Sequence, residues 1–368
     1  MRSENLGETL LPKRVALPIF SSDALSSVAY ATEAILKVLT VGGLAYLYLT
    51  PWVALAVALL MTIVVVSYRQ VIHAYPDGGG SYEVVRQNLG RGPGMVVAAS
   101  LMVDYVMTVA VSVAAGVDNV ISAVPSLNSQ RVLLAVGCVA VLTLVNLRGV
   151  RESGTIFSIP TYGFVFILSA TIIIGMIKVF FGDSPNILAV GTPSQNPIAE
   201  GDPLMWFLVL RAFSAGCAAL TGVEAISNGV SSFKRPEWLN AIKTMAAMGL
   251  LIGFLFLGTT LLARHYGIVY VHGDRETVMS QVGEHVFGRN IIYYLLQGFT
   301  AGILFLAANT AFNGFPPPGA ILARDGYLPR TFHQRGNRLV FRYGFLDLTG
   351  FPILLLIAFN ATTTQPLP

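Results

Sequence analysis

The sequence predicts an all-α polytopic membrane protein built from inverted repeats. Hydrophobic residues make up 54% of its 368 residues and charged residues only 11%, whereas soluble domains are about 25% charged. The mean hydropathy is +0.67, and the apolar residues gather into runs long enough to cross a lipid bilayer. A soluble enzyme and a disordered chain are both excluded.

Charge and cysteine content exclude further classes of protein. The net charge of +4, from 23 basic and 19 acidic residues, is too small and too dispersed for a nucleic-acid partner. Cys138 and Cys217 lie inside apolar runs, which argues against a disulfide scaffold or a cysteine-ligated metal. We therefore predict a lipid-embedded protein that has no resident cofactor and is not an enzyme.

Nine apolar runs have the length of a membrane-spanning helix, about 20 residues. They cover residues 15–39, 44–68, 94–118, 131–147, 155–180, 204–232, 242–263, 290–312 and 343–360. The first run follows Lys13 and Arg14 but has span length and no small-residue cleavage site, so it is not a cleavable signal.

The distribution of basic residues between the loops predicts the orientation. With the N-terminus in the cytoplasm, 16 loop Lys and Arg residues lie inside and 4 outside. This asymmetry follows the positive-inside rule. It predicts a multi-pass protein of the cell (plasma) membrane with a cytoplasmic N-terminus.

The order of the spans suggests two repeats. A repeat of five spans makes the next repeat run upside down, a frequent plan in secondary transporters. A tenth span, which would complete the second repeat, is missing, so we expect these residues to be a fragment or a truncated product. The expected parts are a cytoplasmic N-terminus at 1–14, a first repeat at 15–180, an extracellular loop at 181–203, an incomplete second repeat at 204–360 and a tail at 361–368.

Spans 1 and 6 occupy equivalent places in the two repeats, and both contain small polar residues. Span 1 carries Ser-Ser-Asp-Ala-Leu-Ser-Ser at 21–27, and span 6 carries Ser-Ala-Gly-Cys at 214–217 and Thr-Gly at 221–222. Such stretches in corresponding spans indicate unwound helix and a binding site. The alternative is close packing of helices through small residues.

Three acids lie near the middle of predicted spans: Asp23, Asp104 and Glu224. Each costs about 2.5–3.5 kcal/mol at a helix centre, so we expect all three to serve a function and to meet at one depth. The alternative is that Arg211 forms a structural ion pair with one of them. Glu33 is as well explained by pairing with Lys37, four residues later.

Hydroxyl groups accompany these acids at helical spacing. Asp104, Thr108 and Ser112 follow one another at intervals of four and share a face. Tyr30 lies seven residues after Asp23, and Thr221 three before Glu224. Such oxygen ligands suit a hard, desolvated cation. For any single hydroxyl, a bond to its own or a neighbouring helix is the alternative.

Two other motifs carry less information. The run Asp-Gly-Gly-Gly-Ser at 77–81 lacks the Lys-Ser/Thr of a phosphate-binding loop and suggests a cytoplasmic turn. The spacing of His265, His272 and His285 fits no metal-binding template, and we interpret them as residues of a solvated outer loop.

Several motifs together resemble the KimA-type potassium transporters, a branch of the amino acid–polyamine–organocation (APC) superfamily. They are FSSDALSSVAYATEAI (20–35), PDGGGSYEVVRQNLG (76–90), NLRGVRESG (146–154), LTGVEAIS (220–227), AANTAFNGFP (307–316) and ILARDGYLPR (321–330). The first and fourth are specific to the KimA-like branch, and the resemblance extends from about residue 12 to 360.

The resemblance implies a LeuT-like fold and proton-coupled uptake of K⁺ by alternating access. The family's cation site maps onto Asp23, Tyr30, Asp104, Tyr105, Thr108, Ser112, Thr221 and Glu224. Tyr105 lies one step off the Asp104 face and comes mainly from the resemblance. The family also has twelve spans and a cytoplasmic C-terminal domain associated with homodimers. This chain lacks the last three spans and that domain.

Two alternatives to cation transport stay open. Amino acid permeases of the superfamily carry a Gly-x-Gly break in span 1, where bare amides face a carboxylate. Asp23 stands there instead and favours a cation, but an amino acid or polyamine permease is the alternative. A non-transporting sensor or intramembrane enzyme is more remote, since the His-Glu-x-x-His motif is absent.

If the protein is a transporter, we expect Glu224 to exchange the proton. The alternative is that Glu224 pairs with Arg211 and stabilises span 6.

Overall fold

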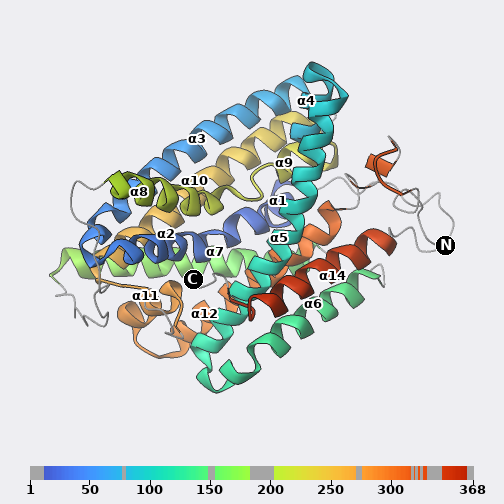
Figure 1. Cartoon of the computed structure of the whole chain (residues 1–368). Helices are drawn as coiled ribbons and strands as arrows, with labels where there is room; N and C mark the ends of the chain where they lie inside the picture. The colour runs from blue at the N-terminus through green and yellow to red at the C-terminus, as the bar shows by residue number, and fades with distance from the viewer. Residues whose placement is uncertain are drawn as a thin grey trace.

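The computed structural model describes residues 12–76, 80–147, 154–182, 203–270, 276–315, 319, 322–323, 326–329 and 342–362. These residues fold almost entirely into helices, most of which run roughly along one axis (Figure 1). The α-helices are α1 (Lys13–Ser26), α2 (Val28–Gly42), α3 (Thr50–Ala74), α4 (Gly80–Leu89), α5 (Arg91–Ala123), α6 (Arg131–Leu147), α7 (Gly154–Phe180), α8 (Pro203–Gly216), α9 (Ala225–Asn228), α10 (Glu237–His265), α11 (Val278–Phe287), α12 (Ile291–Gly314) and α14 (Arg342–Ala358). Four 3₁₀ helices connect them: η2 (Leu44–Leu49), η3 (Pro125–Gln130), η4 (Cys217–Leu220) and η5 (Val230–Ser232).

Eight helical segments in the described part of the chain are long and apolar enough to cross a membrane. They correspond to the first eight predicted spans. The ninth predicted span, at 343–360, corresponds to α14, a helix of 17 residues whose described apolar part is Leu348–Ala358. That it crosses the membrane stays a prediction. The predicted outer loop lies mostly outside the described residues, at 183–202.

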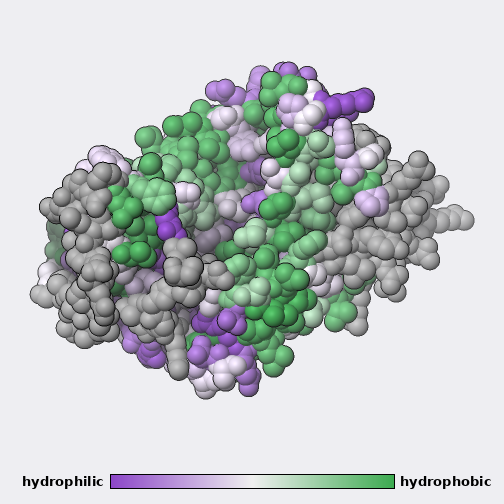
Figure 2. Space-filling model, in the orientation of Figure 1, coloured by the Kyte–Doolittle hydropathy of each residue, from purple (hydrophilic) through white to green (hydrophobic). Residues whose placement is uncertain are grey.

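Hydrophobic side chains cover much of the visible flank of the bundle, as expected of a surface that faces lipid (Figure 2). Hydrophilic side chains gather at the end that carries α4 and at the opposite end of the bundle. Exposed apolar residues on α3, among them Trp52, Leu59 and Ile63, continue this lipid-facing surface.

The first span forms the centre of the bundle. Its two helices, α1 and α2, are the most deeply buried of the eight candidate spans. The helix α1 packs against α7, α10 and α12, whereas α2 packs along α8, the first half of span 6. The two spans predicted to be interrupted therefore lie side by side.

Candidate functional site

Span 1 is interrupted less than its sequence suggests. Only Ser27 falls between α1 and α2, and its φ of −61° and ψ of −25° remain helical. The hydroxyl groups of Ser26 and Ser27 donate to the main-chain oxygens of Asp23 and Ala24, both at 2.7 Å. Serines that bond back to their own helix allow it to continue. The expectation of an unwound stretch over 21–27 is therefore wrong, and the interruption is limited to one residue.

Span 6 is truly broken, as predicted. The helix α8 ends at Gly216 and continues as the 3₁₀ helix η4. Thr221 then adopts a ψ of 139°, and Gly222 a φ of 77°, before α9 begins. A positive φ of this kind suits glycine, which has no β-carbon to clash with its own main chain. The break exposes main-chain groups beside the first span.

The structure brings together the three midspan acids, which we call the acidic cluster: Asp23, Asp104 and Glu224. Asp23 comes from α1, Asp104 from α5, and Glu224 directly precedes α9. Asp23 lies close enough to Asp104 and Glu224 for electrostatic repulsion between their carboxylates. Glu224 and Asp104 repel each other in the same way. Carboxylates crowded in this way repel one another and favour an arriving positive charge.

None of the ion pairs found among the described residues includes a member of the acidic cluster. Arg211, the partner in the alternative interpretation, is exposed on α8 and belongs to none of these pairs. The alternative in which Arg211 braces one of the acids thus finds no support. In the described part of the chain, no basic side chain neutralises the cluster.

Two of the predicted hydroxyl neighbours, Tyr30 and Tyr105, lie near these acids. The hydroxyl group of Tyr30 interacts electrostatically with the carboxylates of Asp23 and Asp104. That of Tyr105 interacts with the carboxylates of all three acids. Thr108 and Ser112 are buried on α5, on the face that begins with Asp104. Thr221 is half-buried and directly precedes Gly222.

Burial differs among the members of the cluster. Asp23 is buried, Glu224 is half-buried and Asp104 is exposed, so the cluster is open on the side of α5. Two buried oxygen atoms, Oδ1 of Asp23 and Oγ of Ser112, have no hydrogen-bond partner in the described part of the chain. Buried polar atoms normally have partners, and these oxygens are suited to ligate a desolvated cation.

One residue beside the site did not emerge from the sequence. The hydroxyl group of Tyr68 in α3 lies 3.5 Å from Oε2 of Glu224 and 2.9 Å from Oγ of Ser81 in α4. Tyr68 therefore connects Glu224 of the acidic cluster to the short helix α4. A tyrosine within an otherwise apolar span was the available signal, but the contact depends on residues 156 positions away.

The predicted pairing of Glu33 with Lys37 is confirmed by a distance of 2.7 Å between their charged groups. Glu33 also accepts a hydrogen bond of 3.2 Å from the main-chain nitrogen of Val278, the first residue of α11. This pair is separate from the acidic cluster, because none of the three acids joins it. Its role in the structure is to hold α11.

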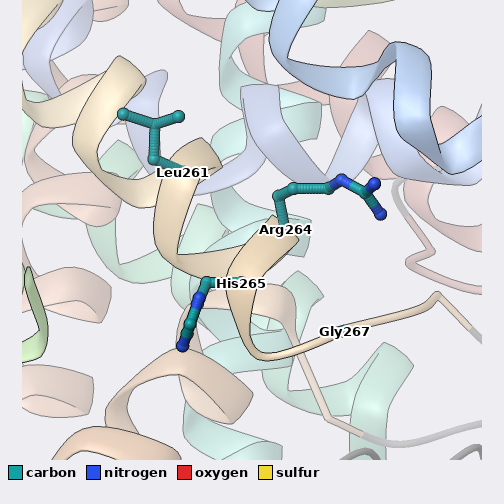
Figure 3. A pocket seen from close by; sticks show the side chains of 4 residues that line it. All are labelled: Leu261, Arg264, His265 and Gly267. Atoms are coloured by element: carbon teal, nitrogen blue, oxygen red, sulfur yellow. The ribbon is translucent and has the colours of Figure 1, made fainter. Parts of the chain in front are cut away.

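A pocket of about 540 Å³ opens at the end of α10, lined by Leu261, Arg264, His265 and Gly267 (Figure 3). The side chains of Arg264 and His265 leave the helix in different directions. The pocket contains no member of the acidic cluster. Among the described residues no group of three or more His, Cys, Asp or Glu could hold a metal ion; His272 lies outside them.

Comparisons with known proteins agree with a membrane transport site. A family model described as "Amino acid permease" matches residues 16–363. The chain is 46% identical over 371 residues to the potassium transporter KimA of Bacillus subtilis, an alignment covering 100% of the chain and 60% of that relative. It is 25% identical over 280 residues to the low-affinity putrescine importer PlaP of Escherichia coli K12, covering 75% of the chain and 59% of the relative. The chain thus spans about three fifths of the length of these relatives.

Proposed function

The chain belongs to the amino acid permease family, and we propose from this premise that it takes up a monovalent cation, K⁺, together with H⁺ by alternating access. The family and the arrangement of helices agree with the predicted LeuT-like inverted-repeat fold. The potassium transporter KimA, 46% identical over the whole chain, supports K⁺ as the substrate.

The observation that carries this proposal is the acidic cluster without a basic partner. Asp23, Asp104 and Glu224 come from three separate elements, and none joins an ion pair with another described residue. A desolvated cation between them would offset their repulsion and complete the coordination of Asp23 Oδ1 and Ser112 Oγ. The proposed ligand set is Asp23, Tyr30, Asp104, Tyr105, Thr108, Ser112, Thr221 and Glu224.

Within this set we assign Glu224 the exchange of the proton and Asp104 the holding of the cation. Glu224 lies beside the break of span 6, and the hydroxyl group of Tyr68 donates a hydrogen bond of 3.5 Å to its carboxylate. A protonated Glu224 would lower the repulsion within the cluster while Asp23 and Asp104 hold the cation, so both ions could be bound together. Release of both to the cytoplasm would then move one cation and one proton inward in each cycle.

The proposed setting is a cell membrane with the N-terminus in the cytoplasm, following the positive-inside rule. In this orientation α4 and Ser81 lie on the cytoplasmic side, whereas α11 and the pocket at the end of α10 lie outside. We also propose that the full-length protein forms a homodimer through a cytoplasmic C-terminal domain, as the resemblance to KimA-type transporters implies.

A second candidate is an amino acid or polyamine permease. The specific support is the putrescine importer PlaP, 25% identical over 75% of the chain, and the acidic cluster could also receive a diammonium ion. Stabilisation by a ligand distinguishes the two. A rise in the melting temperature of the purified protein with K⁺, but not with putrescine or amino acids, favours the cation.

The proposal is tested by K⁺-dependent growth of a host that lacks its own K⁺ uptake. We expect the full-length protein that contains these residues to restore growth at low K⁺. Asp104→Asn in that protein should abolish growth without impairing membrane insertion, since removal of an intramembrane charge makes insertion easier. Glu83→Gln, which changes an acid on the partly exposed helix α4, is the matched control and should retain uptake. Normal uptake by Asp104→Asn would contradict the proposed site.

A further inference from the structure

The main chain of span 6 touches the carboxyl group of span 1 at Gly222. A β-carbon at this position would lie 2.7 Å from Oδ2 of Asp23 and 2.9 Å from the main-chain nitrogen of Ala24. Ordinary van der Waals contact begins only at 3.4 Å. Gly222 is therefore required for space as well as for its φ of 77°.

A second contact joins the same two segments on the next turn. Oγ of Ser27 donates to the main-chain oxygen of Ala24 at 2.7 Å and reaches that of Ala219, in the 3₁₀ helix of span 6, at 3.3 Å. Ser27 is fully buried. The broken span is thus fixed against the first span at two points, Gly222 and Ala219.

These contacts hold Asp23 from two sides and leave one oxygen free. Its main-chain oxygen accepts hydrogen bonds from the nitrogen of Ser27 at 3.2 Å and from Oγ of Ser26 at 2.7 Å. Its Oδ2 lies against Gly222, whereas its buried Oδ1 has no hydrogen-bond partner among the described residues. The position of Oδ1 therefore depends on how closely Gly222 approaches.

We propose that Gly222 is a positioning residue that sets the size selectivity of the cation site, because it determines how far the Asp23 carboxylate reaches toward the ion. This inference rests on the proposed function, in which Asp23 is a cation ligand. A methyl group at 222 would have to move the carboxylate from 2.7 Å to beyond 3.0 Å. That displacement exceeds the difference in radius between K⁺ and Rb⁺, and the attraction between ion and carboxylate varies with their distance.

The competing explanation is that Gly222 is needed only for its backbone conformation. Gly288, between α11 and α12, provides the matched control, since its φ is 70° and nothing lies within 4 Å of a β-carbon there. Gly288→Ala likewise places an alanine at a positive φ, without displacing a ligand. A change in selectivity confined to Gly222→Ala therefore isolates the contact with Asp23.

The experiment measures K⁺ uptake by the purified protein in proteoliposomes, with Rb⁺ and Cs⁺ as competitors. The ratio of the Rb⁺ inhibition constant to the KM for K⁺ reports selectivity independently of the amount of folded protein. We expect Gly222→Ala, which pushes the carboxylate into the site, to disfavour the larger ions and to raise this ratio by about tenfold, the lower end of the effect of one methylene group in a pocket. Gly288→Ala should leave the ratio unchanged.

Ser27→Ala tests the same inference without adding bulk, and so covers the case in which Gly222→Ala does not fold. Loss of the bond to Ala219 loosens the contact between the spans, and we expect the ratio to fall. An unchanged ratio in folded Gly222→Ala or Ser27→Ala, or an equal shift in Gly288→Ala, would overturn the inference. Wild-type protein that transports neither K⁺ nor Rb⁺ would instead refute the proposed function, before any variant is compared.

Discussion

The ammonium group of Lys178, in the last turn of α7, donates a hydrogen bond of 2.7 Å to the main-chain oxygen of Val286, near the end of α11. At the other end of α11 the carboxylate of Glu33 accepts from the nitrogen of Val278. A cation at the C-terminal end and an anion at the N-terminal end both stabilise a helix through its dipole. The short helix α11 is thus held at both ends by residues of the two flanking helices α2 and α7.

Replacement of Lys178 by Met should loosen α11 without affecting the rest of the bundle. The variant loses one charged hydrogen bond and one favourable dipole interaction, together about 2 kcal/mol. Hydrogen–deuterium exchange of residues 278–287 should become faster, while exchange in α3 and α10 stays the same. Lys243→Met, at an exposed lysine of α10, is the control. Unchanged exchange in α11 would contradict the assigned contact.

Removal of one partner from the Glu33–Lys37 pair should destabilise the protein more than removal of both. The side chains are only 8% and 10% exposed, and loss of one partner from a buried pair costs about 3–5 kcal/mol. We expect the destabilisation by Glu33→Gln to lie near the lower end of this range, since the carboxylate of Asp118 still attracts the ammonium group of Lys37.

Thermal unfolding of the two single variants and of Glu33→Gln/Lys37→Met checks this prediction. The double variant should have a higher melting temperature than Glu33→Gln alone, because no buried ammonium group is left without its partner. If the effects of the two substitutions simply add, the pair contributes little coupling.

The close approach of α4 to α9 predicts a clash that a second substitution relieves. A β-carbon at Gly80 would lie 1.8 Å from Oδ1 of Asn228. Gly80→Ala should therefore lower the melting temperature, and Gly80→Ala/Asn228→Ala should recover part of the loss. Gly90→Ala, at a φ of 93° with open space around it, measures the cost of backbone strain alone. Equal losses for Gly80→Ala and Gly90→Ala would show that the clash is absent.

Glu224→Gln separates a proton carrier from a structural brace. A carrier that can no longer ionise should leave K⁺ binding in place but remove the dependence of uptake on a proton gradient. The measurement is K⁺ uptake into proteoliposomes, once with equal pH on both sides of the membrane and once with a lower pH outside. A brace would instead lose folded yield, with the surviving protein still responding to pH. Proton-driven uptake by well-folded Glu224→Gln would eliminate the carrier role.

The parts of the fold that depend on local pattern could be predicted from the sequence. Apolar length identified eight spans, and the Thr221–Gly222 pair identified the break in span 6. The serines of span 1 suggested a similar break, but their hydroxyl groups bond to carbonyls three residues earlier and the helix continues. The same residue types favour either outcome, and the local hydrogen bonds decide.

Contacts between distant residues could not be predicted. The i, i+4 spacing indicated that Glu33 pairs with Lys37, but its bond to Val278 spans 245 positions. The sequence likewise placed Asp23 and Gly222 at breaks without indicating that one presses on the other. Asp104 was expected inside a span, whereas its exposure depends on how the neighbouring helices cover α5. Such relationships arise only from tertiary packing.

Because α1 and α2 are nearly continuous through Ser27, the two sides of the candidate site differ in stiffness. On one side, a helix that keeps its main-chain hydrogen bonds before and after Ser27 resists bending. On the other, the segment from Cys217 to Gly229 is a series of short 3₁₀ and α-helical turns joined by a turn at 221–224, without the continuous hydrogen bonding of a long helix. An entering ion would therefore displace this segment before it displaced the helix. The movement would then pass from span 6 into α4, which rests against α9.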